Sequence, residues 1–227
     1  MLMNGICVAR EQLLLLIGHG FDPCHLILCF QQFVDAFFLC HLLCQQGELG
    51  VCPNTKNYII CDSIEECCKD ADIITVAVST PTGGHTNYPF IEREWIKPGC
   101  LITSVGAVDF PDELVSDPNT LLVVDNKKLY EAWADEYPYP TFDKMFLLGD
   151  KFTDMAHDGK LDWNSVVNIG AIASGKVPGR TSDDQIILYS IGGMPVEDVA
   201  WGKTVYENAV AKGIGTKLNL WDKPYLY

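Results

Sequence analysis

Short apolar runs alternate with helix-forming segments from residue 57 onward, and this alternation constrains the fold of the 227-residue chain most. The three clearest runs, Ile73–Val78, Leu101–Val105 and Leu121–Val124, are rich in β-branched and aliphatic residues. Runs of this kind are typical of parallel strands that are buried on both faces. The alternation predicts an α/β protein with a doubly wound, Rossmann-like parallel sheet, in which these three strands are neighbours.

Helices are expected between the strands. Ser63 precedes Glu66 by three positions, which is the capping-box signature of a helix N-terminus. Further helices are expected over Phe90–Ile96 and Lys127–Trp133.

The last part of the chain carries one long helical pattern between two apolar runs. Gln185–Tyr189 is an expected strand, and Thr216–Leu220 is expected to be a final one. Between them, Pro195–Lys212 predicts a long amphipathic helix, since a proline begins it and Gly213 follows its end.

The first 52 residues differ in composition from the rest, because they contain no Lys and only one Arg. Six of the ten cysteines lie there, and the pairs Cys24/Cys29 and Cys40/Cys44 sit in apolar runs without the turns of a zinc site. We therefore expect reduced thiols in a cytoplasmic protein and no metal site.

Polar residues interrupt the 24–44 stretch, so no membrane span is predicted. The net charge of −14 argues against nucleic acid and anionic membranes as partners.

A possible dinucleotide loop follows the first apolar run, Leu13–Ile17. Gly18 and Gly20 come directly after it, and glycines at this point let a pyrophosphate approach a helix N-terminus. The third glycine of the usual pattern is absent, and Asp22 stands where the helix is expected to start. A plain turn is the alternative to cofactor binding by these two glycines.

Polar residues also follow three of the expected strands. The carboxyl ends of parallel strands face the ligand crevice, so Ser79 and Thr80 are candidates to hold a ribose or a nicotinamide. Asp109 follows the next strand and is a candidate general acid or base. Ser190 precedes a glycine pair and a helix N-terminus, a second possible cofactor surface. Ordinary polar loops are the alternative in each case.

These segments together resemble the ornithine cyclodeaminase/mu-crystallin family over about residues 55–227. The resemblance depends on the order and spacing of four groups of residues. They are Asp70-Ala71-Asp72-Ile73-Ile74 leading into Ser79-Thr80, Trp95-Ile96-Lys97-Pro98-Gly99 before Val105-Gly106-Ala107, Ser182-Asp183-Asp184-Gln185 before Ser190-Ile191-Gly192, and Val196-Glu197-Asp198-Val199-Ala200.

The resemblance implies an NAD- or NADP-dependent enzyme that acts on an amino acid or imine, such as ornithine cyclodeaminase, which forms proline and ammonia. It implies that Asp109, or the position just before it, exchanges the proton, and that Ile191 contacts the substrate. The implied cofactor-lining residues are Gly18, Gly20, Ser79, Thr80, Val105, Gly106, Ala107 and Ser190. The basic residue that the family carries shortly after the acid has no counterpart here.

The family architecture implies two domains and a homodimer. Residues 1–184 are expected to form the cofactor-binding domain, with 1–52 divergent, and 185–227 the C-terminal part of a substrate and dimerisation domain. Ketimine reduction and opine or alanine dehydrogenation are alternative chemistries of the same family. A catalytically impaired fragment that only binds a cofactor or ligand is the remaining alternative.

Overall fold

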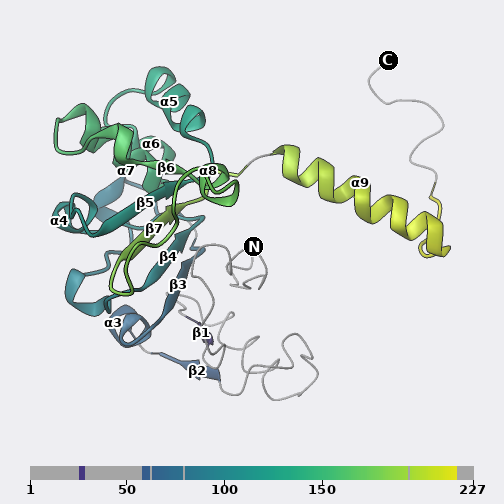
Figure 1. The fold of residues 1–227 in the computed structure, drawn as a ribbon, viewed down its shortest axis with the longest axis horizontal. Coiled ribbons are helices and arrows are strands. Elements are labelled where there is room, and N and C mark those ends of the chain that lie inside the picture. The colour runs from purple at the N-terminus through teal and green to yellow at the C-terminus, as the bar shows by residue number, and fades with distance from the viewer. Residues whose placement is uncertain (1–25, 29–57, 62, 79, 194, 219–227) are drawn as a thin grey trace. The chain divides into compact units, whose positions relative to one another are not determined.

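The structure, a computed structural model, describes residues 26–28, 58–61, 63–78, 80–193 and 195–218 (Figure 1). The chain divides into two compact units, Met1–Gly192 and Gly193–Tyr227. The predicted glycine loop at Gly18 and Gly20, and the predicted cofactor residue Ser79, lie outside the described residues.

The first unit contains all described strands and most of the helices. The strands are β1 (Leu26–Leu28), β2 (Tyr58–Ile60), β3 (Ile73–Val76), β4 (Leu101–Ser104), β5 (Thr120–Val124), β6 (Val167–Asn168) and β7 (Ile186–Ser190). The helices are α3 (Ile64–Cys68), α4 (Asp112–Val115), α5 (Lys127–Glu136), α6 (Phe142–Met145), α7 (Leu148–His157) and α8 (Ile169–Ala173). Short 3₁₀ turns are η1 (His85–Asn87), η2 (Arg93–Trp95) and η3 (Trp163–Ser165).

Five of these strands form a sheet in the order β3-β4-β7-β5-β6, and every neighbouring pair is parallel. Strands β1 and β2 form a separate parallel pair. Figure 1 shows α5, α6 and α7 gathered beside the five-stranded sheet. The predicted parallel α/β fold is therefore confirmed.

The prediction that β3, β4 and β5 are direct neighbours is wrong for β4 and β5, because β7 pairs with both of them. Ile187 and Leu188 of β7 have no exposed surface, and Ile186 has 3%. A strand that is apolar on both faces is most stable in the middle of a sheet, where helices or other layers cover each face. The strand that was expected to open the second domain at 185 thus lies inside the sheet, and the division falls after Gly192.

Apolar residues of the strands alternate between two core clusters, one on each face of the sheet. In β4, Ile102 belongs to the larger cluster, which includes Phe152 and Met155 of α7. Leu101 belongs to the smaller one, which includes Ile172 of α8. Successive side chains of a strand point to opposite faces, so burial on both faces gives the uninterrupted apolar runs seen in the sequence.

Local signals predict some helices well and one poorly. Ser63 accepts a hydrogen bond from Glu66 N at 3.1 Å and caps α3, as the capping-box signature predicts. The helix expected over Lys127–Trp133 is present as α5 and continues to Glu136. The prediction of a helix over Phe90–Ile96 is wrong, because only the short 3₁₀ turn η2 forms there. Phe90 instead forms an isolated β-bridge with Asp109.

The second unit consists mainly of α9, which spans Pro195–Lys212 as predicted. The final strand expected from Thr216 does not form over residues 216–218, and residues 219 and 220 lie outside the described part. None of the helices described here is both long and apolar enough to cross a membrane.

Candidate active site

The carboxyl ends of β3, β4 and β7 lie side by side, because the three strands are parallel and in register. Ser104 at the end of β4 pairs with Val76 of β3 on one side and with Ser190 of β7 on the other. Beyond the strands, Ile191 N donates a hydrogen bond to Ser104 O at 2.8 Å. The sheet therefore brings the segments that carry Thr80, Asp109 and Ile191 to one edge.

Val105, which directly follows β4, carries an exposed apolar side chain at this edge of the sheet. Every residue from Cys100 to Phe110 is buried except Val105, whose exposed fraction is 46%. Ile191, on the neighbouring strand end, is partly exposed. An exposed apolar side chain at the carboxyl end of a central parallel strand offers a flat surface at the place where such sheets bind ligands.

Gly106 is required by the backbone of the neighbouring segment. A Cβ atom at this position would lie 2.5 Å from Val78 O and 2.8 Å from Val78 N, far inside contact distance. Ser104 Oγ also donates a hydrogen bond to Gly106 O at 2.7 Å, which fixes the turn. Ala107 is fully buried and packs with Tyr88 and Phe142. A contact of Gly106 and Ala107 with a cofactor stays a prediction. Such a contact would have to use the backbone of these two residues.

Asp109 is a buried carboxylate held by a buried lysine. Lys151 Nζ of α7 lies 2.5 Å from Asp109 Oδ1, and both residues have an exposed fraction of 8%. The same carboxylate oxygen accepts a hydrogen bond from Phe110 N at 2.7 Å. The Asp109 backbone pairs with the segment after β3, since its N–H donates to Pro89 O at 2.8 Å. The predicted acid is thus fixed both by its backbone and by its side chain.

A second carboxylate and a second lysine extend this ion pair toward the surface. Asp112 Oδ1 lies 3.1 Å from Lys151 Nζ, and Asp112 Oδ2 lies 2.9 Å from Lys160 Nζ. Burial alone would raise the pKa of Asp112, but the hydrogen bonds from Lys160 and Lys151 hold it below its ordinary value. Asp112 therefore stays ionised near neutral pH and shares Lys151 with Asp109.

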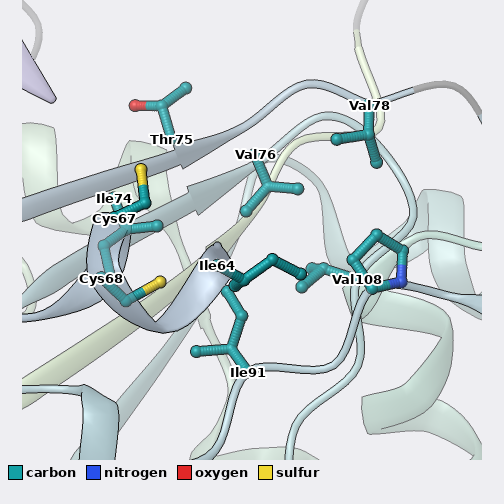
Figure 2. A pocket seen from close by; sticks show the side chains of 10 residues that line it. Ile64, Cys67, Cys68, Ile74, Thr75, Val76, Val78, Ile91 and Val108 are labelled. Carbon is teal, nitrogen blue, oxygen red and sulfur yellow. The ribbon is translucent and has the colours of Figure 1, made fainter. Parts of the chain in front are cut away.

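Val108, the position just before Asp109, is turned away from the site. It is fully buried and lines a small apolar cavity of about 40 Å³ with Cys68, Val76 and Ile91 (Figure 2). Ligand pockets usually have volumes of about 300–1,000 Å³, so this cavity cannot hold a nicotinamide or an amino acid. Of the two positions considered from the sequence, Asp109 alone carries a polar group.

Ser190 is fully buried, and its hydroxyl has partners inside the protein. Ser190 Oγ accepts a hydrogen bond from Gly149 N at 2.8 Å and lies 3.1 Å from the Tyr130 phenol oxygen. Gly192 N, two residues further on, donates to Asp125 Oδ2 at 2.9 Å. These bonds fix the shape of the turn after β7, and a direct contact between Ser190 and a cofactor stays a prediction.

Tyr88 is buried and packs against Ala107, next to the segment that carries Asp109. Its phenol donates a hydrogen bond to Phe142 O at 3.1 Å, and its ring meets the Phe142 ring edge-on. Burial raises the pKa of Tyr88 to about 12, and the carboxylates of Asp143, Asp150 and Asp109 add to this shift. Tyr88 therefore remains a neutral phenol throughout the physiological range.

Three residues of this region were not singled out from the sequence. Lys151 comes from α7, far from the predicted motifs along the chain, whereas Asp125 directly follows an expected strand and Tyr130 lies within an expected helix. Thr80, which the sequence predicts as a cofactor-binding residue, is exposed at the same edge of the sheet. Its contact with a cofactor stays a prediction. Only the fold shows that Lys151 supplies the positive charge that is missing near Asp109 in the sequence.

The parallel sheet and the residues at its carboxyl edge define a Rossmann-like α/β protein. Residues 53–213 match the model of the ornithine cyclodeaminase/mu-crystallin family, and the chain belongs to that family.

Curated relatives include three enzymes of related kinds. N-((2S)-2-amino-2-carboxyethyl)-L-glutamate dehydrogenase of Staphylococcus aureus is 26% identical over 166 residues, which are 73% of this chain and 43% of that protein. Alanine dehydrogenase of Archaeoglobus fulgidus is 28% identical over 135 residues, 57% and 37% of the two chains. Delta(1)-pyrroline-2-carboxylate reductase of Bacillus cereus is 26% identical over 160 residues, 67% and 42% of the two. The chain spans less than half the length of these relatives.

Solved structures share the fold. Delta(1)-pyrroline-2-carboxylate reductase of Thermococcus litoralis, in complex with NADH and L-proline, has a TM-score of 0.57 and 21% identity over 84% of this chain and 51% of that one. Iminosuccinate reductase of Paracoccus denitrificans, in complex with NAD⁺, has a TM-score of 0.54 and 19% identity over 80% and 48% of the two chains.

Proposed function

We propose that the protein is an NAD- or NADP-dependent oxidoreductase that interconverts a small amino acid and the corresponding imine. The observation that carries the proposal is the exposed Val105 at the end of β4, followed four residues later by the buried Asp109–Lys151 pair. An apolar surface for a planar ring and a fixed carboxylate are thus presented on one short segment of the chain.

The residues at the sheet edge fit a nicotinamide ring. Val105 and the partly exposed Ile191 offer apolar contact, and the exposed Thr80 offers a hydroxyl at the neighbouring strand end. Bound there, a nicotinamide supplies the acceptor or donor of a hydride at the substrate α-carbon.

Asp109 accounts for the proton. When an amino acid is oxidised, the α-carbon loses a hydride and the ammonium group loses one proton, which leaves the protonated imine (iminium). Asp109 accepts that proton in oxidation and returns it in reduction, as a positioned general base and acid. The ion pair with Lys151 holds the Asp109 carboxylate in place for this exchange.

The substrate is proposed to be a small amino acid or a cyclic imine carboxylate. The pyrroline-2-carboxylate reductases and amino-acid dehydrogenases among the relatives support this class. Cyclisation of ornithine to proline and ammonia uses the same oxidation and reduction at one α-carbon, and it remains a proposal of the same kind. A homodimer is also proposed, since one structure that shares the fold is an alanine dehydrogenase dimer with bound NAD.

Titration with NADH and NADPH, followed by nicotinamide fluorescence, tests the cofactor proposal. We expect saturable binding, and Val105→Asp should weaken it at least tenfold because a charge would replace the apolar surface. Ala132→Asp, an exposed change on α5, is the matched control and should bind normally. Absence of any fluorescence change up to millimolar cofactor would contradict the proposal.

The chemistry is tested by oxidation of NADH in the presence of Δ1-pyrroline-2-carboxylate, and in the reverse direction with L-proline, L-alanine and L-ornithine. We expect turnover with at least one member of this set. If the protein binds NADH but turns over none of these compounds, the proposed oxidoreductase activity is contradicted, whereas the cofactor proposal stands.

A further inference from the structure

Lys151 has no free hydrogen-bonding capacity. An ammonium group has three N–H donors, and the Lys151 ammonium has three acceptors around it. It lies 2.5 Å from Asp109 Oδ1, 2.5 Å from Phe110 O and 3.1 Å from Asp112 Oδ1. A buried lysine saturated in this way is unsuited to react with a substrate, and it is well suited to hold other groups in place.

The two carboxylate oxygens of Asp109 differ in the number of hydrogen bonds that they accept. Oδ1 receives both Lys151 Nζ and Phe110 N. No hydrogen bond reaches Oδ2 from any residue in the part of the chain that the structure describes. The arrangement fixes the carboxylate by one oxygen and leaves the other with its lone pairs available.

We infer that Lys151 is the positioning residue for Asp109: it holds Oδ1 from α7 and thereby presents Oδ2 as the atom that exchanges the proton with the substrate amine. This inference rests on the proposed function. It also explains how the chain manages without a basic residue directly after the acid, because α7 delivers the charge 42 residues further along.

Other charged and titratable groups also face this pair. Asp112 of α4 is the second carboxylate on Lys151, and Lys160 neutralises its outer oxygen. Tyr88, from the segment after β3, is close enough to be influenced by Asp109 and stays neutral. Lys151 is therefore the positive charge in direct contact with Asp109 among the described residues.

The test compares Lys151→Met with Lys151→Arg and with Lys160→Met, which removes the other cation on Asp112 but none on Asp109. The first readout is the pH profile of NAD⁺ reduction with L-proline, the direction in which Asp109 must be ionised to accept the proton. In Lys151→Met, the buried carboxylate loses its counter-charge, so its protonated form becomes more favourable and the acidic limb should move up by about 1–3 pH units. Lys151→Arg should keep the limb near its original position, and Lys160→Met should leave it unchanged.

The second readout does not need turnover. In protein labelled with ¹³C at aspartate carboxyls, the Asp109 signal is assigned by its loss in Asp109→Asn and then titrated in each variant. We expect the same upward displacement in Lys151→Met alone. If the Asp109 signal and the acidic limb stay in place in Lys151→Met, the inference is overturned. If NADH does not bind to the unmodified protein, the proposed function fails, whereas the titration still decides whether Lys151 controls Asp109.

Discussion

The phenol oxygen of Tyr130 in α5 lies 3.1 Å from the hydroxyl of Ser190 at the end of β7, and both residues are fully buried. Gly149 N of α7 donates to the same hydroxyl at 2.8 Å. Burial raises the pKa of Tyr130 above its ordinary value, and the charge of nearby Asp125 adds to the effect. Two helices are thereby joined to the strand end from which the candidate site is built.

Tyr130→Phe should lower the free energy of unfolding by about 1–2 kcal/mol, because buried polar groups lose a partner while the ring still fills its space. Urea denaturation followed by tryptophan fluorescence measures the change. Tyr137→Phe is the matched control, since Tyr137 is exposed at the end of the same helix, and its effect should stay within about 0.5 kcal/mol. Equal midpoints for the two variants would contradict the structural role of the buried bond.

Gly106→Ala should be destabilising, because the added methyl group would lie 2.5 Å from Val78 O. Overpacking of this kind costs about 1–3 kcal/mol. Gly170→Ala in α8 is the control, because among the described residues no atom outside its own helix backbone and chain neighbours lies within 4 Å of its Cβ position, and alanine favours helix. Thermal unfolding should show a lower midpoint for Gly106→Ala only. A Gly106→Ala protein that is as stable as the control would mean that Val78 can move aside.

The sequence predicted those features that depend on neighbouring residues. The bounds of α9 are correct because Pro195 and Gly213 are local start and stop signals. The strands of the sheet at residues 73–76, 101–104, 120–124 and 186–190 were predicted because double-sided burial leaves an uninterrupted apolar pattern, whereas the strand expected from Thr216 does not form over residues 216–218. Both signals can be recognised without knowing which segments meet.

Long-range pairing could not be predicted in this way. Nothing local to Ile186–Ser190 indicates that this strand enters between β4 and β5, since the choice depends on the competing burial of all five strands. The partnership of Asp109 with Lys151 is equally non-local, because it depends on how α7 packs. Sequence reasoning therefore found the carboxylate of the candidate site but not the group that holds it.

Asp150 is a buried acid at the start of α7, and burial raises its pKa to about 8. Its Oδ2 accepts a hydrogen bond from Leu147 N at 3.1 Å, while Oδ1 has no partner among the described residues. Between the ordinary value of 3.8 and about 8, the folded protein binds this proton and the unfolded chain does not. The stability that this proton contributes is present at low pH and is lost as the pH rises toward 8.

Asp150→Asn should remove this part of the pH dependence. We expect the unfolding free energy of the variant, relative to the unmodified protein, to increase from pH 5 to pH 8 by at most about 1.4 kcal/mol for each pH unit. Urea titrations at several pH values measure the difference. Asp135→Asn, an exposed change on α5, should run parallel to the unmodified protein. A constant difference between Asp150→Asn and the unmodified protein would show that Asp150 is ionised throughout this range.

Asp109→Asn tests the proposed chemistry most directly. Loss of a positioned general base should lower the rate of NADH-linked turnover by about 10²–10⁴-fold. Binding of NADH should hardly change, because the apolar surface at Val105 is untouched. Glu113→Gln, an exposed acid on the neighbouring helix α4, is the matched control and should keep the full rate. An unaltered rate in Asp109→Asn would exclude this carboxylate and direct attention to Asp112, the other acid in contact with Lys151.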